Sequence, residues 1–416
     1  GTVGIGGAHG MSSGQVRIVY AAYLDATKDY SVDKRGDVGS WSRLAAMQGL
    51  TDLITAACLV DDEDLRAGLG PLVGQSICAM LKQLSEKLDN VRAAAGEHLE
   101  RLIGTGGDGS APPPSAGLVP RCDELRAILL AGAPDGRQQA DVLWNWALAY
   151  ETFPKMVKVM DLGEYHYHVV AGLVLSVGGL TEAVVKSSSG ALLAWAKHAS
   201  KGGDGGARLE GLLATFSRLF DEHRDADRVI LPLLKTLELL LVNGIYDGWA
   251  ASEPPPAPMV EVVSWVQRES RRSTNVPKLF STVNVLVSLL GHRDPLRRQA
   301  LQSMLVFLGH RFPRVRKHAA EQLYSKVLVD GDVLFNDGGD AASAAAEGGE
   351  EKRRQDVEDL LCTVVWDAEL QYVRAQRAAL AKLLKVDIDA LAAESAKTDT
   401  AARSRKKEQQ DELASY

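Results

Sequence analysis

The sequence predicts an all-α protein in which amphipathic helices stack in antiparallel pairs to form an α-solenoid. Through most of the 416 residues, apolar side chains recur at every third or fourth position, as they do on one face of a helix. The alternating pattern of a half-buried strand is nearly absent. Segments rich in glycine, proline and serine separate the helical stretches, so each helix is expected to bury its apolar face against its neighbours along the chain.

Two stretches show the helical period most clearly. In the first, Asp225 or Asp227 can cap the start and Asn243-Gly244 provides the stop. Its apolar residues fall on one broad face: Ile230, Leu233, Leu234, Leu237, Leu240 and Leu241. In the second, Pro277 opens a helix that Gly291 closes. Its inward residues are predicted to be Leu279, Phe280, Val283, Leu286, Val287 and Leu290.

The composition predicts one long helical-repeat domain, residues 14–395, between a flexible N-terminal segment, residues 1–13, and a flexible tail, residues 396–416. Four loop insertions interrupt this domain, because their Gly, Pro, Ser and Ala residues cannot bury enough apolar surface to become ordered. They lie near residues 104–118, 201–206, 252–258 and 337–350.

A short pattern recurs inside the helical stretches. An apolar or small residue precedes an arginine, an alanine follows three residues after the arginine, and a leucine or methionine follows four residues later. The four copies begin at Ser42, Val91, Leu296 and Val315. On a helix these positions share one face, and the small alanine lets a neighbouring helix approach closely. The pattern resembles the second helix of HEAT repeats, so the predicted fold is a HEAT/armadillo-like α-solenoid.

The arginine of each copy indicates an ion pair. It lies in the early turns of its helix, where a positive charge opposes the helix dipole, so an acidic partner is expected nearby. Asp37, Asp89 and Asp294 precede three of the arginines and could cap the helix and pair with the arginine at once. Arg316 has no such acid before it, and its partner is expected to come from an adjacent repeat.

Composition argues against several classes of function. A formal net charge of −7 does not fit a nucleic-acid groove, which needs a concentrated basic face. The longest apolar stretch, residues 169–180, is too short to span a bilayer, and residues 1–11 lack the features of a signal peptide. The four cysteines include no CxxC pair, which indicates reduced thiols, a cytoplasmic location and no metal framework. No catalytic or cofactor-binding constellation is found.

Longer strings in the sequence resemble one family. The segment Arg35-Gly36-Asp37-Val38-Gly39, followed by Trp41 and Arg43, is similar to the RGDVGxWxR segment of the tubulin-folding cofactor D family. Three further segments resemble strings of the same family, among them SVGGLTE and PLLKTLxxLLxNG; they lie at residues 85–99, 165–195 and 231–247. The resemblance covers nearly all of the predicted ordered chain and corresponds to the C-terminal third of the family's members.

The resemblance implies a cytoplasmic chaperone cofactor, with the microtubule cytoskeleton as a possible location. Members of the family receive β-tubulin after its release from the chaperonin. With tubulin-folding cofactors E and C and an Arf-like small GTPase, they assemble or disassemble the αβ-tubulin heterodimer and contribute to GTPase activation without being enzymes. The alternative is a generic HEAT-repeat scaffold unrelated to tubulin, which would share the arginine pattern but lack the family's longer strings.

Six residues are candidates for contact with a partner protein, and three of them lie in the RGDVGSW segment. Arg35 and Asp37 flank a glycine suited to a tight turn, and Asp37 can also cap the following helix. Trp41 could anchor a partner, but a tryptophan buried between helices is the more common role. A structural role for the whole segment is therefore the alternative.

The other three candidates are arginines. An arginine supplied in trans to a GTPase can stabilise the charge that develops in phosphoryl transfer. Arg271, Arg272 and Arg314 are the possible donors, with Arg311 beside them. The alternative is a solvated or capping role for each, and the sequence does not choose among them.

Overall fold

A computed structural model describes residues 12–60, 63–104, 111–130, 144–179, 181–201, 205–250, 252, 255–335 and 347–387. Helices account for most of these residues, and their strands form a single hairpin, β1 (Val32–Asp33) and β2 (Gly36–Asp37). The predicted all-α solenoid of stacked helices is confirmed, since helices pack against partners that are near in sequence. The chain divides into two compact units, residues 1–219 and 220–416.

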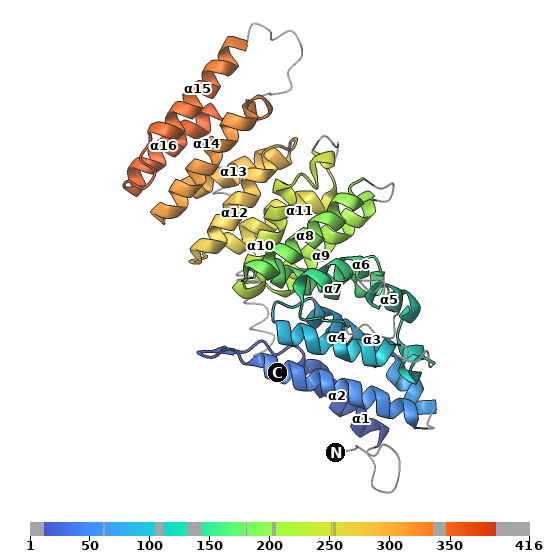
Figure 1. Ribbon diagram of the computed structural model, residues 1–416. Coiled ribbons are helices and arrows are strands. Elements are labelled where there is room, and N and C mark those ends of the chain that lie inside the picture. The colour runs from blue at the N-terminus through green and yellow to red at the C-terminus, as the bar shows by residue number, and fades with distance from the viewer. Residues whose placement is uncertain are drawn as a thin grey trace, which may run out of the picture. The chain divides into compact units, whose positions relative to one another are not determined.

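The first unit contains the hairpin, a short 3-10 helix and the first eight α-helices, with most of the ninth (Figure 1). Its helices are α1 (Ser13–Ala26), α2 (Gly39–Leu59), α3 (Glu63–Leu84), α4 (Asp89–Ile103), η1 (Pro114–Leu118), α5 (Cys122–Leu129), α6 (Ala149–Val159), α7 (Gly163–Val177), α8 (Glu182–Ala199) and α9 (Gly205–Glu222), which crosses into the second unit.

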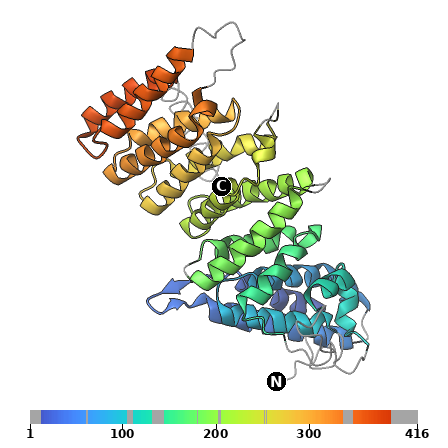
Figure 2. The ribbon, with the colours of Figure 1, turned by 45° about the horizontal axis from the view of Figure 1, so that its top comes forward.

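Helices of the first unit pack against their neighbours in the sequence and also against helices further along the chain. α2 packs against α1 and α4, α3 packs against α4 and α7, and α6 packs against α7 and α8. Contacts between alternate helices arise when helix pairs are stacked side by side. Figure 2 shows this stacking within the unit. The apolar core between the helices includes Met47, Leu50, Leu81, Leu99 and Leu173, each almost fully buried.

The second unit continues the same arrangement. Its helices are α10 (Asp227–Val242), η3 (Asp247–Trp249), α11 (Ala257–Ser270), α12 (Val276–Leu289), α13 (Leu296–Leu308), α14 (Pro313–Phe335), α15 (Glu347–Thr363) and α16 (Leu370–Leu383). α12 packs against both α10 and α14, and α11 packs against α13. α10, α12 and α14 therefore form one row, in which the helices run parallel, and α11 and α13 form another.

The two stretches with the clearest helical period form α10 and α12. All six residues predicted on the apolar face of α10 are buried. α10 ends at Val242, and Gly244 follows with a φ of +70°, which favours glycine. In α12, four of the six predicted residues are buried, whereas Phe280 and Val287 are only half-buried. These two side chains face the surface formed by the row of α10, α12 and α14.

Parts of the predicted insertions are helical. In the range near 104–118, η1 is anchored by the Ser115 hydroxyl, which donates to the Leu102 carbonyl over 2.9 Å. Three helices begin inside the other predicted insertions: α9, α11 and α15. The predicted tail lies outside the described residues, as does the predicted N-terminal segment except for Ser12 and Ser13 at the start of α1.

The predicted pairing of the repeat arginines with preceding acids is present. Arg43 is fully buried, and its guanidinium donates two hydrogen bonds to the Asp37 carboxylate, of 3.1 and 3.0 Å. The same carboxylate accepts the Ser40 amide over 3.1 Å, which satisfies one free N–H at the start of α2. Arg92 donates to Asp89, and Arg297 donates to Asp294 over 3.3 Å.

The ion pair expected for Arg316 is not present among the described residues, although the charge of Asp367, in the turn after α15, does act on the Arg316 guanidinium. No acid of an adjacent repeat forms an ion pair with it among the described residues; its guanidinium donates instead to four backbone carbonyls. Two belong to the turn before α14, His310 (2.9 Å) and Arg311 (3.3 Å), and two to the turn after α15, Trp366 (2.7 Å) and Ala368 (2.7 Å). The planar guanidinium supplies enough donors to satisfy carbonyls that the helices leave unpaired.

Arg92 makes the same kind of bridge. It donates to the carbonyls of Glu86 (2.9 Å) and Lys87 (3.0 Å), six and five residues before it, and also to Ala147 in the segment before α6. Arg316 contacts carbonyls at the same two offsets. In both units, therefore, a buried arginine ties the turn before its own helix to a turn of a later repeat.

We expect Arg316→Ala to lower the free energy of unfolding by about 3 kcal/mol, because several charge-assisted hydrogen bonds to buried carbonyls are lost together. Arg316→Lys should recover little of this, since an ammonium cannot reach both turns. Urea denaturation followed by circular dichroism measures the effect. Arg298→Ala on α13 is the control: its side chain is 67% exposed, and a change below about 0.5 kcal/mol is expected. Equal midpoints for all variants would contradict this role of Arg316.

Gly172 marks a close approach between α7 and α3. A Cβ atom at this position would lie 2.5 Å from the Lys82 carbonyl oxygen and 2.6 Å from the Ser85 Cβ. The Ser176 hydroxyl, one turn later on α7, donates to the Ser85 carbonyl over 2.7 Å. The glycine therefore allows the helix contact that brings this hydrogen bond into range.

The same substitution at two helical glycines should have opposite effects. Gly172→Ala is expected to destabilise the chain by about 1–3 kcal/mol, because the backbone of α3 would have to move. Gly190→Ala, in α8, should stabilise it by about 0.5–1 kcal/mol, because nothing lies within 4 Å of the added methyl group and alanine favours the helix. Thermal unfolding of both variants tests the pair, and a stabilised Gly172→Ala would show that the helices are not in close contact.

Candidate partner-binding surfaces

The RGDVGSW segment forms the β-hairpin of the first unit. Val32 pairs with Asp37 and Asp33 with Gly36, and the φ of +106° at Gly36 is one that glycine adopts readily. The Asp33 carboxylate accepts the Arg35 amide over 2.7 Å and the Arg35 Nε over 2.9 Å. The tight turn predicted from the glycines is therefore present, and Arg35 is held on its exposed side.

The structure places Trp41 on the surface, not between helices as the more common role would require. Its side chain is 59% exposed, in the first turn of α2, and the Arg35 guanidinium lies 5.1 Å from the centre of its ring. Val32 on the hairpin is 67% exposed. We call Val32, Arg35 and Trp41 the hairpin patch. An exposed tryptophan beside an arginine is typical of the residues that dominate protein interfaces.

The turn between α11 and α12 is held by a buried cation. The Lys278 side chain is 3% exposed and pairs with Glu269 over 3.2 Å and with Asp227 over 2.9 Å. Asn275 accepts the Lys278 amide over 3.2 Å and donates to Asp227 over 2.7 Å. Burial alone would raise the pKa of Asp227, but the hydrogen bonds from Lys278 and Asn275 together lower it. The buried charge is thus fully compensated.

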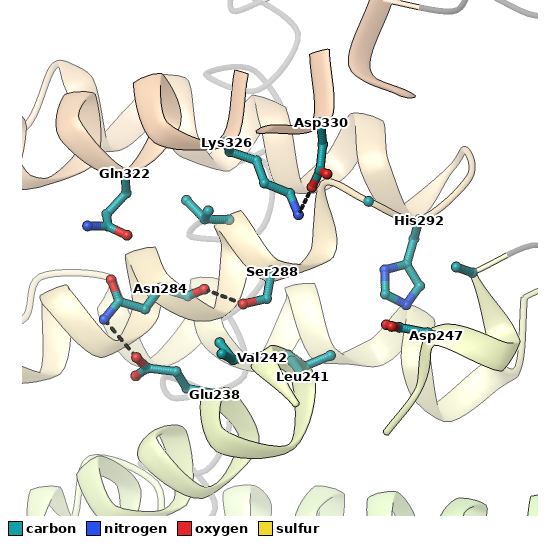
Figure 3. A pocket seen from close by; sticks show the side chains of 13 residues that line it. Glu238, Leu241, Val242, Asp247, Asn284, Ser288, His292, Gln322, Lys326 and Asp330 are labelled. Carbon is teal, nitrogen blue, oxygen red and sulfur yellow. Dashed lines mark hydrogen bonds and ion pairs between the residues drawn. The ribbon is translucent and has the colours of Figure 1, made fainter. Parts of the chain in front are cut away.

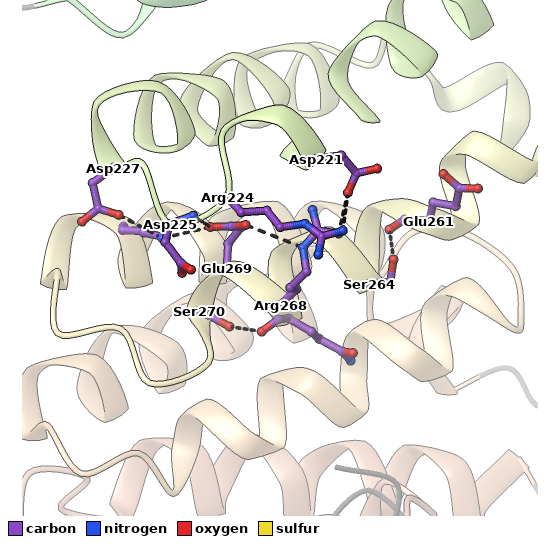
Figure 4. Close-up of polar contacts among 11 residues, drawn as sticks. Asp221, Arg224, Asp225, Asp227, Glu261, Ser264, Arg268, Glu269 and Ser270 are labelled. Atoms are coloured by element: carbon purple, nitrogen blue, oxygen red, sulfur yellow. Dashed lines mark hydrogen bonds and ion pairs between the residues drawn. The ribbon is translucent and has the colours of Figure 1, made fainter. Parts of the chain in front are cut away.

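Further ion pairs extend this network to the turn between α9 and α10 (Figure 4). Glu269 also accepts the Asp225 amide over 3.3 Å. Asp221 pairs with Arg224 over 3.0 Å and with Arg268 over 2.8 Å. The hydrogen bond from Arg224, together with the charge of Arg268, lowers the pKa of Asp221. Both turns are therefore fixed to α11.

Arg271 and Arg272 are exposed on the α11–α12 turn. Arg272 has a φ of +63°, and both arginines line a cleft of about 450 Å³ that also contains Ser273 and Thr274. Two of the three acids that line this cleft, Asp227 and Glu269, are paired with Lys278. The rim of the cleft therefore carries cationic side chains on a fixed turn.

Arg314 is exposed in the first turn of α14. Because α12 and α14 run parallel in one row, the turns that precede them lie on the same edge of the second unit. The three candidate arginines are thus placed along one edge, whereas Arg35, Asp37 and Trp41 belong to the first unit. Arg311, in the turn before α14, lies with its guanidinium carbon 4.7 Å from the centre of the Phe312 ring.

A groove that the sequence did not reveal crosses the row of α10, α12 and α14 (Figure 3). Its volume is about 500 Å³, and η3 with the turn after α12 closes one end. Glu238 of α10 accepts the Asn284 amide of α12 over 2.9 Å, and the Asn284 oxygen lies 2.7 Å from the His318 Nε2 of α14. His318 in turn stacks on Phe280, with ring centres 4.3 Å apart.

Two polar residues of this groove, Glu238 and Asn284, and the adjoining His318 come from separate helices. Burial raises the pKa of Glu238 and lowers that of His318, which favours an uncharged imidazole between the helices. Glu238, Asn284 and His318 are 46 and 34 residues apart, and no local spacing in the sequence relates them. The sequence contained one indication of this surface. Phe280 and Val287 are apolar residues of α12 that were predicted to face inward, and in the structure they lie half-buried beside the groove.

The motif Tyr165-His166-Tyr167-His168 lies in α7 and makes contacts within the protein. The Tyr165 hydroxyl donates to the Pro120 carbonyl, and the His166 Nδ1 lies 2.8 Å from the Met160 carbonyl oxygen. In the part of the chain that the structure describes, no group of three or more His, Cys, Asp or Glu side chains is placed to hold a metal ion. In the same part, no helix has the length and apolar character needed to cross a bilayer.

Comparison with known proteins shows which family the chain resembles. Residues 74–278 match the family described as "Tubulin folding cofactor D C terminal". The chain is also similar to Tubulin-specific chaperone D of Dictyostelium discoideum, with 24% identity over 338 residues. That match covers 76% of this chain and 22% of the relative, so the chain spans about a fifth of the length of the relative. The resemblance of the chain to the C-terminal part of the tubulin folding cofactor D family is thus confirmed.

Proposed function

We propose that the chain is a tubulin-folding cofactor segment that binds β-tubulin and, with partner cofactors E and C and an Arf-like small GTPase, helps to assemble or disassemble the αβ-tubulin heterodimer in the cytoplasm. The match of residues 74–278 to the C-terminal region of tubulin folding cofactor D carries this proposal. The printed name of the Dictyostelium relative, a tubulin-specific chaperone, supports it.

The proposed mechanism is binding without chemistry by the chain itself. Rows of stacked helices present long surfaces, and contacts along them can add up to a standard protein interface. A chaperone that binds one state of tubulin more tightly than another shifts the equilibrium between free and dimeric subunits. We propose two surfaces for these contacts. One is the exposed hairpin patch, and the other, which we call the arginine edge, is the edge of the second unit that carries Arg271, Arg272 and Arg314.

The arginine edge also supports a contribution to GTPase activation. Arg271 and Arg272 are exposed on a turn held by the ion pairs of Lys278, and Arg314 is exposed in the first turn of α14, so the backbone that carries these side chains loses little conformational entropy on binding. A guanidinium presented to a partner's nucleotide could stabilise the transferring phosphoryl group. The chain would then assist the partner's hydrolysis and have no active site of its own.

Co-purification tests the binding proposal. The chain, folded by far-UV circular dichroism, is expected to retain β-tubulin on an affinity column and to retain more when the Arf-like GTPase is present. Replacing Trp41 by alanine should weaken retention at least tenfold if the hairpin patch is an anchor. Tyr150→Ala, which removes another side chain that is 65% exposed in the first unit, is the control and should leave it unchanged. If the folded chain retains neither β-tubulin nor the GTPase, the result would support the alternative, a generic HEAT-repeat scaffold.

Single substitutions test the arginine edge. If one of Arg271, Arg272 or Arg314 acts in trans, its change to alanine should reduce GTP hydrolysis in the assembled complex about 10³-fold or more, while the complex still forms. Single-turnover hydrolysis and gel filtration measure the two effects. Arg298→Ala should change neither. If hydrolysis falls only in step with complex formation for all three arginines, they serve binding alone.

A further inference from the structure

The groove over α10, α12 and α14 contains a buried imidazole, that of His292, which is 5% exposed. Among the described residues, no donor or acceptor lies in hydrogen-bonding geometry with either of its ring nitrogens, although Asp247 and the Leu289 backbone act on its pKa. Figure 3 shows its ring at one end of the groove, facing Asp247 of η3. A buried polar group is normally paired, so this arrangement points to a ligand that completes it. Burial lowers the pKa of His292, so the neutral ring offers one acceptor nitrogen at pH 7.

The charges of the groove favour a cationic ligand. Glu238, Asp247 and Asp330 contribute three carboxylates, and Lys326 is the one Lys or Arg side chain among the lining residues. Lys326 is already engaged, because it forms an ion pair with Asp330 one turn away on α14. Glu238 accepts a hydrogen bond from the neutral Asn284 amide, and the cation that acts on its charge, Lys235 one turn earlier on α10, is not among the lining residues. Two negative charges are therefore left without a cation of the groove itself.

The rest of the lining suits the side chains of a peptide. Val242 is 69% exposed at the end of α10, and Leu241 and Val287 line the groove beside it. A volume of about 500 Å³ is of the size that accommodates a small ligand or a few side chains, not a folded domain. The lining thus combines apolar contact area with acceptors at both ends.

We propose that this groove binds a segment of a partner protein that carries a lysine or arginine next to an apolar residue. The cationic group donates to the Asp247 carboxylate and to the free nitrogen of His292, and the apolar side chain packs on Val242. Glu238 attracts a second cation at the other end. This site deepens the proposed function and depends on it in one respect, that the chain acts by binding proteins.

A peptide pair tests the charge preference. A fluorescein-labelled peptide of sequence Gly-Ser-Leu-Lys-Leu-Arg-Ser-Gly should bind the full chain, whereas the same peptide with glutamate in both basic positions should not, as measured by fluorescence anisotropy. Asp247→Asn and Glu238→Gln should each weaken binding of the basic peptide about tenfold. Glu261→Gln, an exposed carboxylate on α11, should leave it unchanged. Equal binding of both peptides, or no effect of the groove variants, would overturn the proposal and show that the groove is only a water-filled cleft.

His292→Phe separates a binding role from a packing role. Removing two unpartnered ring nitrogens should keep or raise the urea midpoint while weakening the basic peptide about tenfold. A lower midpoint with unchanged peptide binding would make His292 a packing residue and overturn the proposal. Retention of β-tubulin is measured in parallel. If the chain binds tubulin but not the basic peptide, only the proposal for the groove is refuted. If it binds the basic peptide but not tubulin, only the proposed tubulin function is refuted.

Discussion

The buried guanidinium of the repeat arginine is the interaction on which the helix stack depends. Helix ends and turns leave carbonyl groups without donors, and burying them unpaired is costly. Arg316 satisfies carbonyls in the turn before its own helix and the Trp366 carbonyl 50 residues after it, and Arg92 does the same with the Ala147 carbonyl 55 residues after it. Because one rigid, planar group bonds to both turns, it fixes the spacing of successive repeats. The surfaces formed by helix rows and by their edges inherit their shape from this spacing.

The range of each contact explains which parts of this network could be predicted. Asp37 and Asp89 lie within six residues of their arginines, so helix capping and the helix dipole were sufficient to pair them. The acceptors around Arg316 are carbonyls of the turn before α14 and of the turn after α15, and a sequence cannot single out such carbonyls because every residue has one. An acid was therefore expected where the backbone provides the acceptors.

Side-chain exposure on the surface was harder to predict than the fold. The apolar period of α10 identified its buried face correctly because that face contacts neighbouring helices along its whole length. Trp41 has the large apolar side chain of a core residue, and only its exposure in the structure shows that none of the described helices covers it. The groove depends on Glu238, Asn284 and His318 meeting across three helices, and this requires the parallel stacking that the turns impose.

The second unit separates its charges in a way that suits a binding protein. Its turn edge presents Arg271, Arg272 and Arg314, and two acids in the cleft beside the first two, Asp227 and Glu269, are paired with Lys278. Its groove presents carboxylates in excess, and the one lysine there is paired on its own helix. A single fold can thus hold an anionic group at its edge and a cationic segment on its face at the same time. Each set of charges is kept in place by backbone and ion-pair contacts formed before any partner arrives, which limits the entropy lost on binding.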